Sequence, residues 1–427
     1  MNYDHIREPY DEVTLENGLK VIFLPKPAYC TSAFLFMTPF GSLDVIQKNA
    51  QGETITYEPG TAHFLEHKLF ESDAEDVMRK FSRLGANVNA YTSYDSTAYY
   101  FTTTSQDVLT PLTLLLDFVQ HFSITEASVE KEKPIILEEL AMYQQDPDAR
   151  LFLESMRAVY SFHPLGSDIV GDESSIRAIT LSHLEEAYRR NYHPSTMTLI
   201  AVTSAPKEEV LECIRANQAA KHRSSGERLV RWFREEPPHP AHTMVRIPME
   251  LAQPKTSVTI RLPIPQGSLK ECLRMEWALR LGLETVFTPI HPLYQSWIDE
   301  GRITAYFSYE ADCTPDYAFL YFEDAQSDAE KLKQFVMEQL DGLCEEGVKE
   351  ADLEQLKRRV IGAVVRSSEH PSDLISTWAR AQIRGVTPYE ECDLVHELTA
   401  EDCTILIRSL DRSCISCVTL VQEGENA

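Results

Sequence analysis

Apolar residues recur with two different periods along the first 205 residues, which predicts strands mixed with helices. Short apolar runs at 19–24 and 31–42 are typical of strands, and an Asn-Gly turn precedes the first of them. Between residues 59 and 84 the spacing becomes helical, and Gly85 follows as a helix-terminating glycine would. The pattern therefore predicts one helix over 59–84. Residues 86–104 alternate as strands do. Two further helices are predicted, one at 110–122 and one that starts near Thr125.

The second half of the chain repeats the apolar pattern of the first half. Residues 25–42 resemble residues 252–268, and residues 195–204 resemble residues 413–422. A charged stretch at 218–239, ending in prolines, separates the halves and has the composition of a linker. We predict an α+β fold of two homologous α/β half-domains, each an antiparallel-rich sheet packed with helices. The predicted boundaries are an N-terminal domain at 1–217, a linker at 218–239 and a C-terminal domain at 240–427.

The net charge, the apolar runs and the cysteines of the chain limit its possible functions and its cellular location. A formal net charge of −26 argues against non-specific binding to nucleic acid or to anionic membranes. The N-terminus is polar and no apolar run approaches bilayer length, so we expect a cytoplasmic protein. The nine cysteines are scattered, as in proteins of reducing compartments. Cys414 and Cys417 fall on a predicted strand, where residues three apart face opposite ways, so we expect core packing rather than a metal site.

The candidate chemistry lies in GTAHFLEHKLFE, residues 60–71. His63 and His67 stand four apart, which places both imidazoles on one face of a helix. Glu66 directly precedes the second histidine and points to a neighbouring part of that face. Two imidazoles can bind zinc, and a carboxylate beside them can accept a proton from water. This H-x-x-E-H spacing is an established zinc-peptidase signature, although a solvated helix with a histidine pair would show it too.

A catalytic zinc needs a third protein ligand, and the helix that starts near Thr125 offers acidic residues for this role. Glu132 and Glu139 are seven apart and share a face. Glu139 lies beside three expected core residues, where a carboxylate is costly unless it is paired or binds a metal. These residues are Ile135, Ile136 and Leu140. The rival Glu138 is turned away from that face, and Pro134 can kink the helix.

The chain resembles the pitrilysin/insulinase class of inverted-motif zinc peptidases, and in particular bacterial members of about 420 residues similar to mitochondrial processing peptidase. Segments that match in order over about the first 205 residues are LENGLKVIFLPKP, EPGTAHFLEHKLFE, GANVNAYTSYDSTAYYF, EKEKPIILEELAMYQQDPDA, FHPLGSDIVGDESSI and NYHPSTMTLIAV. The resemblance implies a zinc endopeptidase in which His63, His67 and Glu139 bind Zn²⁺. It also implies that Glu66 is the general base and that Glu132 orients the catalytic site.

The resemblance further implies that an extended peptide substrate docks as an added strand along Asn89, Ala90 and Tyr91. The alternative for these residues is an ordinary hairpin with Asn89 in its turn. Because a folded protein cannot offer a free strand, the substrates are expected to be peptides or unstructured segments.

One feature of the class is missing from this chain. Active members often carry an Arg and a Tyr seven residues apart in the second half, where they help to hold the substrate. Here the position of the Arg is Ile298, while Arg302 and Tyr306 are only four apart. We therefore expect a dimer, either with a paralogous subunit that supplies the missing groups or with a second copy of the chain. Lys68 and Pro134 occupy variable positions and are expected to lie apart from the chemistry. A non-catalytic scaffold or peptide-binding subunit is the alternative function.

Overall fold

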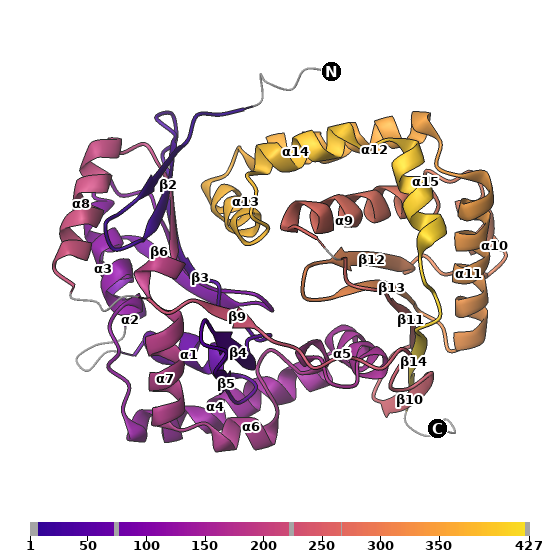
Figure 1. Cartoon of the computed structure of the whole chain (residues 1–427), viewed down its shortest axis with the longest axis horizontal. Coiled ribbons are helices and arrows are strands. Elements are labelled where there is room, and N and C mark those ends of the chain that lie inside the picture. Colours follow the sequence, from indigo (N-terminus) through magenta and orange to yellow (C-terminus); the bar gives the residue numbers. More distant parts are fainter. Residues whose placement is uncertain (1–6, 72–76, 222–225, 266, 423–427) are drawn as a thin grey trace. The chain divides into compact units, whose positions relative to one another are not determined.

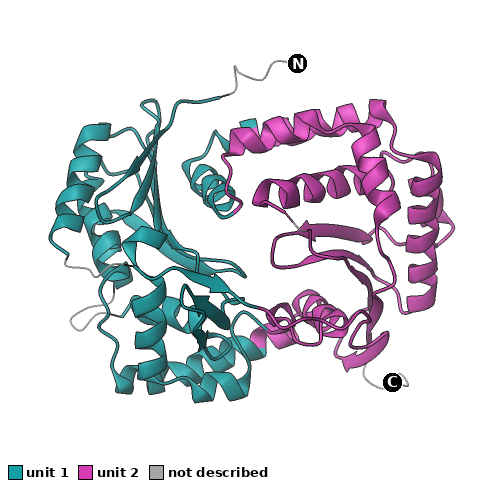
Figure 2. Ribbon diagram, viewed as in Figure 1, with its two compact units in different colours: residues 1–141, 168–232, 365–383 teal, residues 142–167, 233–364, 384–427 magenta. Residues whose placement is uncertain are grey.

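The computed structural model of the chain describes residues 7–71, 77–221, 226–265 and 267–422. Its contacts form two compact units that are discontinuous in sequence (Figure 2). Unit 1 holds residues 1–141, 168–232 and 365–383, and unit 2 holds 142–167, 233–364 and 384–427. The domain boundaries expected from the sequence stay a prediction, because contacts do not mark where one homologous half ends. No described helix has the length and apolar character that crossing a membrane requires.

The elements of unit 1 come mainly from the first half of the chain (Figure 1). They are β1 (Asp11–Thr14), β2 (Lys20–Pro25), β3 (Ser32–Thr38), β4 (Ile46–Asn49), β5 (Thr54–Thr56), α1 (Thr61–Leu69), α2 (Val77–Arg83), β6 (Ala86–Thr92), β7 (Thr97–Thr103), α3 (Leu109–Val119), most of α4 (Glu126–Gln145), α6 (Glu173–Ala178), α7 (Leu181–Asn191), η3 (Pro194–Thr196), β8 (Thr198–Thr203), α8 (Lys207–Ala219), β9 (Leu229–Arg231) and α13 (Pro371–Ile383).

The elements of unit 2 come mainly from the second half. They are α5 (Pro147–Val159), η2 (Pro164–Gly166), β10 (Met244–Met249), β11 (Lys255–Arg261), α9 (Leu269–Glu284), α10 (Tyr294–Asp299), β12 (Ser308–Cys313), β13 (Ala318–Asp324), α11 (Ala329–Glu346), most of α12 (Glu350–Ser367), α14 (Pro388–Glu397), α15 (Ala400–Ser409) and β14 (Ile415–Gln422).

The two main sheets have the same topology, which confirms the α+β fold of two related halves. Strand order is β1-β2-β8-β3-β7-β6 in unit 1 and β10-β14-β11-β13-β12 in unit 2. When β1 is left out, each sheet has five strands. From one edge of the sheet to the other, these are the first, last, second, fourth and third strands in order along the chain. In both sheets the first and last strands pair in parallel, and the other neighbours are antiparallel. The repeated segments noticed in the sequence form β3 and β11, and β8 and β14.

The middle of the unit 1 sheet is covered on both faces, and one cover comes from the far end of the chain. Phe34 and Leu199 belong to the apolar core that also contains residues of α1 and α3. Their neighbours Leu35 and Ile200 point to the opposite face and are also fully buried. On that face α13 packs against β3 and β8, with Trp378 only 1% exposed (Figure 1). The sheet of unit 1 therefore needs a helix from the second half of the sequence.

Unit 2 shows the reciprocal arrangement. Leu151 of α5, a helix from the first half of the sequence, packs with Val418 and Leu420 of β14. On the other face of β14, Cys417 joins the core formed with α9, α11 and α15. Cys414 and Cys417 are both buried, which confirms the expected core packing of this pair, although β14 begins at Ile415 and Cys414 lies just before the strand.

The single helix predicted over 59–84 is wrong, because α1 ends at Leu69 and α2 begins at Val77. The N–H of Phe70 bonds the carbonyls of His67 and Lys68 at the end of α1. Helical spacing continues on both sides of the break, so periodicity alone does not reveal it. Residues 72–76 of the predicted helix lie outside the described residues. Gly85 follows α2 with a φ of +70°, as expected for a helix-terminating glycine.

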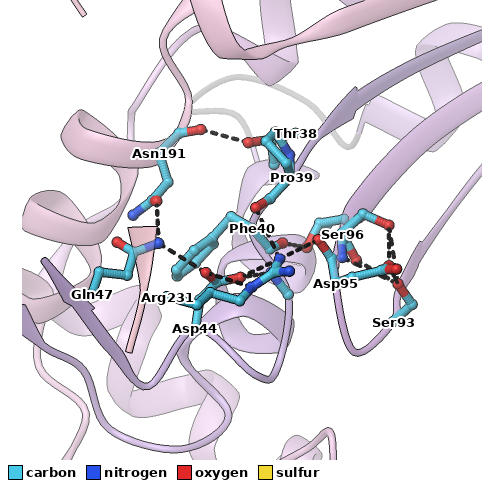
Figure 3. Close-up of polar contacts among 12 residues, drawn as sticks. Thr38, Pro39, Phe40, Asp44, Gln47, Ser93, Asp95, Ser96, Asn191 and Arg231 are labelled. Atoms are coloured by element: carbon cyan, nitrogen blue, oxygen red, sulfur yellow. Dashed lines mark hydrogen bonds and ion pairs between the residues drawn. The ribbon is translucent and has the colours of Figure 1, made fainter. Parts of the chain in front are cut away.

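Part of the predicted linker is built into unit 1, while its residues 222–225 lie outside the described residues. The strand β9 pairs with β4, and Arg231 donates to both carboxylate oxygens of Asp44 at 2.9 Å (Figure 3). Arg231 also donates to the carbonyl of Asp95, at 2.6 Å, in the turn that follows β6. That turn packs closely on Gly41, where a Cβ would lie 2.5 Å from the backbone nitrogen of Ser96. Arg231 thus fixes the end of β6.

Candidate active site

The helix α1 begins at a glycine that no other residue could replace without strain. Gly60 has a φ of +86°, and a Cβ there would lie 2.2 Å from the carbonyl oxygen of Val170. From this start α1 runs through the centre of unit 1 beside β6, β7 and α7. Seven of its nine residues are buried, and His63 is only 7% exposed. The helix is therefore a rigid internal support for the side chains it carries.

The two imidazoles of α1 meet a carboxylate from α4, as the sequence predicts. The ring centroids of His63 and His67 are 4.6 Å apart. Their Nε2 atoms lie 3.6 Å and 3.3 Å from the two carboxylate oxygens of Glu139. The rival Glu138 is exposed. Glu139 is therefore the acidic residue that joins the histidines.

The surroundings of Glu139 match the sequence analysis only in part. Ile136 and Leu140 are buried as expected, but Ile135 is 47% exposed. The prediction that Ile135 is a core residue was wrong, because its phase on the helix turns it to solvent. Pro134 lies inside α4, which continues through it to Gln145.

The residues fit a zinc ion. Their three donor atoms lie within 4.8 Å of one another, and they form the one group of this kind among the described residues. Tetrahedral ligands at about 2.0–2.2 Å from zinc stand roughly 3.3–3.6 Å apart, and each Nε2 lies at such a distance from one of the two oxygens of Glu139. Two imidazoles and one carboxylate are also a donor set found at catalytic zinc, with a position left for water.

Glu132 and Lys68 lie directly behind this group. One oxygen of Glu132, Oε1, lies 3.0 Å from Nδ1 of His67. With Nδ1–H donating to Glu132, the Nε2 lone pair faces Glu139 and is available to a metal. The expectation that Lys68 lies apart from the chemistry was wrong. Its Nζ donates to the other oxygen of Glu132, at 3.1 Å.

The candidate general base is held by a residue that the sequence analysis missed. Thr92, the last residue of β6, donates its hydroxyl to Oε2 of Glu66 at 2.7 Å. One carboxylate oxygen is thus fixed and the other is left for a different partner. Thr92 follows Asn89, Ala90 and Tyr91 in a strand, so it lies on the same side as Ala90. That side packs against the core that holds α1, which is the signal that could have identified it.

The expected substrate residues lie on an open sheet edge. Asn89, Ala90 and Tyr91 are in the interior of β6, opposite Tyr100, Tyr99 and Ala98 of β7. Asn89 is therefore not in a turn, so that part of the alternative interpretation is wrong. Among the described strands, β6 pairs with β7 alone, and on its other edge the N–H of Ala90 donates to Oδ1 of Asn89 at 2.9 Å. The side chains of Asn89 and Tyr91 are exposed.

The ionisable groups of the site stabilise one another's charged forms. Burial alone would lower the pKa of His67, but its hydrogen bonds to Glu132 and Glu139 raise it to about 9. The contacts with His63 and His67 lower the pKa of Glu139. Burial opposes the charge of Glu132, yet the hydrogen bond from His67 and the ammonium of Lys68 lower its pKa. Until a metal binds, both ring nitrogens of His67 therefore carry a proton at neutral pH, and the proton on Nε2 has to leave before that atom can act as a ligand.

Ile298, at the expected Arg position, and the nearby Arg302 both have partners within unit 2. Ile298 packs against the apolar core of that unit. Arg302 pairs with Glu338, and its guanidinium lies 5.1 Å from the ring centre of Phe335. Tyr306 is 69% exposed. The guanidinium of Arg302 is therefore held by Glu338 and Phe335, and Arg302 does not replace the missing Arg.

Comparison with known proteins gives matches along most of the chain. Residues 53–173 match "Insulinase (Peptidase family M16)", and residues 178–360 match "Peptidase M16 inactive domain". The chain is 32% identical over 408 residues to "Uncharacterized zinc protease YmfH" of Bacillus subtilis, covering 94% of each chain. It is 30% identical over 203 residues to the mitochondrial-processing peptidase subunit beta of Neurospora crassa. This match covers 47% of the chain and 41% of the relative. An M16-like peptidase from Alicyclobacillus acidocaldarius superposes with a TM-score of 0.91 and 29% identity, covering 97% and 98%.

The raised pKa of His67 predicts that a proton leaves when zinc enters. Since the pKa of His67 is about 9 in the metal-free protein, zinc binding at pH 7 releases about one proton. The apparent dissociation constant for zinc then falls about tenfold for each pH unit from 6 to 8. Calorimetric titration in buffers with different ionisation enthalpies measures the released proton.

The control for this titration is an exposed histidine. His67→Ala should lose zinc binding, whereas His239→Ala should behave as the wild type, because His239 is exposed. Zinc binding at pH 7 without proton release would contradict the assignment.

Proposed function

Because the chain belongs to the M16 insulinase and pitrilysin family of zinc proteases, we propose that it is a zinc-dependent endopeptidase that cleaves peptides or unstructured segments. The observation that supports this most strongly is the contact of His63 and His67 with Glu139 from a separate helix. These three residues would hold the zinc. When bound, zinc would supply a Lewis acid that polarises the scissile carbonyl and lowers the pKa of water.

Glu66 carries the proton transfers in this proposal. With Oε2 fixed by the hydroxyl of Thr92, the other oxygen accepts the proton of the attacking water and then donates it to the leaving amine. Glu132 does not contact the reacting atoms. It fixes the ring of His67 through Nδ1 and thereby aims Nε2.

The substrate is bound mainly through its backbone. No described strand pairs with the outer edge of β6, and an extended peptide can add to it as another strand once it displaces the side chain of Asn89, whose Oδ1 accepts from the N–H of Ala90 at 2.9 Å. Because Thr92 ends this strand and bonds Glu66, a peptide on the edge of β6 is led towards the general base. Backbone binding places few demands on the substrate sequence.

We also propose that the chain works as a dimer, with a paralogous subunit or with itself. Ile298 stands where an Arg is expected, and Arg302 is engaged by Glu338 and Phe335. A paralogous chain, unlike a second copy, would supply the missing substrate-holding groups. The Neurospora crassa relative carries the description of a subunit, which supports this proposal.

The role of Glu66 is tested by two graded substitutions in the complete protein. Glu66→Gln keeps the shape but cannot accept the proton, so kcat should fall by about 10²–10⁴-fold with zinc content unchanged. Thr92→Val removes only the hydroxyl and should lower kcat by roughly tenfold, the value of one hydrogen bond to a charged group. Glu138→Gln, an exposed neighbour on α4, is the matched control and should leave kcat unchanged.

The same measurements decide between enzyme and scaffold. A zinc-loaded wild type that is as inert as Glu66→Gln, even with its paralogue present, would favour a non-catalytic scaffold. Peptide binding that persists without cleavage would favour a peptide-binding subunit.

The dimer proposal predicts that activity depends on a second chain. Adding a relative that lacks H-x-x-E-H but carries the Arg and Tyr should raise kcat/KM by about a hundredfold, as expected for a restored transition-state contact. Analytical ultracentrifugation should show the complex. Full activity in a demonstrably monomeric chain would overturn the proposal.

A further inference from the structure

We propose that Lys68 is a positioning residue of the metal site, acting through Glu132 on His67 and on the docking of α4 against α1. This inference rests on the proposed zinc-dependent function and assigns a role to a residue that was expected to lie apart from the chemistry. Lys68 contacts no donor atom of the metal group itself. Its effect is therefore expected on metal affinity, through the geometry of the ligands.

Lys68 is a fully buried lysine between two carboxylates. Its side chain is 0% exposed, on a helix face that otherwise carries apolar residues. Nζ lies 3.1 Å from Oε2 of Glu132 and 2.6 Å from Oε1 of Glu71. A buried ammonium is costly unless it is paired and hydrogen-bonded. The two carboxylates meet this requirement, and one of them is the partner of a proposed metal ligand.

The carboxylate of Glu132 divides its oxygens between neighbouring residues of α1. Oε2 accepts from Lys68, while Oε1 faces Nδ1 of His67 at 3.0 Å. Because a carboxylate is planar and rigid, fixing Oε2 also fixes the direction of Oε1. The ring of His67 is then held with Nε2 towards Glu139, at 3.3 Å. Without Lys68, the carboxylate of Glu132 is free to rotate about its side-chain bonds, and Oε1 no longer holds the ring of His67 in this orientation.

The pair also sets the position of the third ligand. Glu132 and Glu139 lie on one face of α4, two turns apart. The contact of Lys68 with Glu132 ties the first of these turns to the C-terminal end of α1. The second turn then brings Glu139 to both imidazoles. Lys68 therefore helps to set the register in which the two helices meet.

A purely structural role is the rival explanation, and unit 2 provides a matched control for it. Lys357 is also buried, at 3% exposure, and pairs with Glu354 at 2.8 Å. It donates to the carbonyl of His396 as well. Replacing either lysine by Met removes a buried ammonium and keeps an unbranched apolar side chain. Only Lys68 is joined to a proposed metal ligand through its carboxylate partner.

The test measures zinc affinity of the full chain by competition with a chromophoric chelator, beside its stability to denaturant. Lys68→Met should weaken zinc binding by about 10–100-fold, the usual effect of losing a partner behind a ligand. Lys357→Met should leave the zinc dissociation constant unchanged even where stability falls. Equal zinc affinity in Lys68→Met and wild type would overturn the inference, as would an equal loss in both lysine variants.

A double variant shows whether Lys68 acts through Glu132 and remains informative if Lys68→Met does not fold. In Lys68→Met/Glu132→Gln both buried charges are gone, and the remaining partner Glu71 is 40% exposed, so no buried charge is left unpaired. Its zinc affinity should equal that of Glu132→Gln alone, because the two residues act in series. A further loss beyond Glu132→Gln would overturn the inference. A wild type that binds no zinc would instead overturn the proposed function.

Discussion

The contact between α1 and α4 is the constraint on which the site depends. The helix α1 contributes two imidazoles and an ammonium in His63, His67 and Lys68, and α4 contributes two carboxylates in Glu132 and Glu139. Each carboxylate faces positive or proton-donating groups of the other helix, so the two helices meet in one register. The same pairing leaves the Nε2 atoms and Glu139 facing one point. A divalent cation at that point satisfies all three donors at once.

The rest of unit 1 holds this helix pair and the general base in place. Gly60 permits a close approach of the backbone at the start of α1, which a side chain would prevent. Arg231 and Asp44 fix the turn after β6, and Thr92 at the end of β6 holds Glu66. In the sheet that carries β6, the other face of β3 and β8 is covered by α13, a helix from the second half of the sequence. Segments far apart in the chain are therefore needed to build a local site.

The sequence predicted what depends on spacing and missed what depends on packing. The four-residue spacing of His63 and His67 and the seven-residue spacing of Glu132 and Glu139 fix shared helix faces, so these residues came together as expected. The break after α1 was missed because its apolar period continues in α2. The contact of Lys68 with Glu132 was not predicted, because the spacing of apolar residues does not show which carboxylate a buried lysine contacts. The cover supplied by α13 was also hidden, since it joins segments more than 150 residues apart.

The most direct measurement of the central claim is anomalous diffraction at the zinc absorption edge from crystals of the complete chain grown with one equivalent of zinc. The account predicts a single strong peak in each chain, about 2.0–2.2 Å from Nε2 of His63, Nε2 of His67 and a carboxylate oxygen of Glu139. A peak elsewhere, with Glu139 turned away from both rings, would contradict the account.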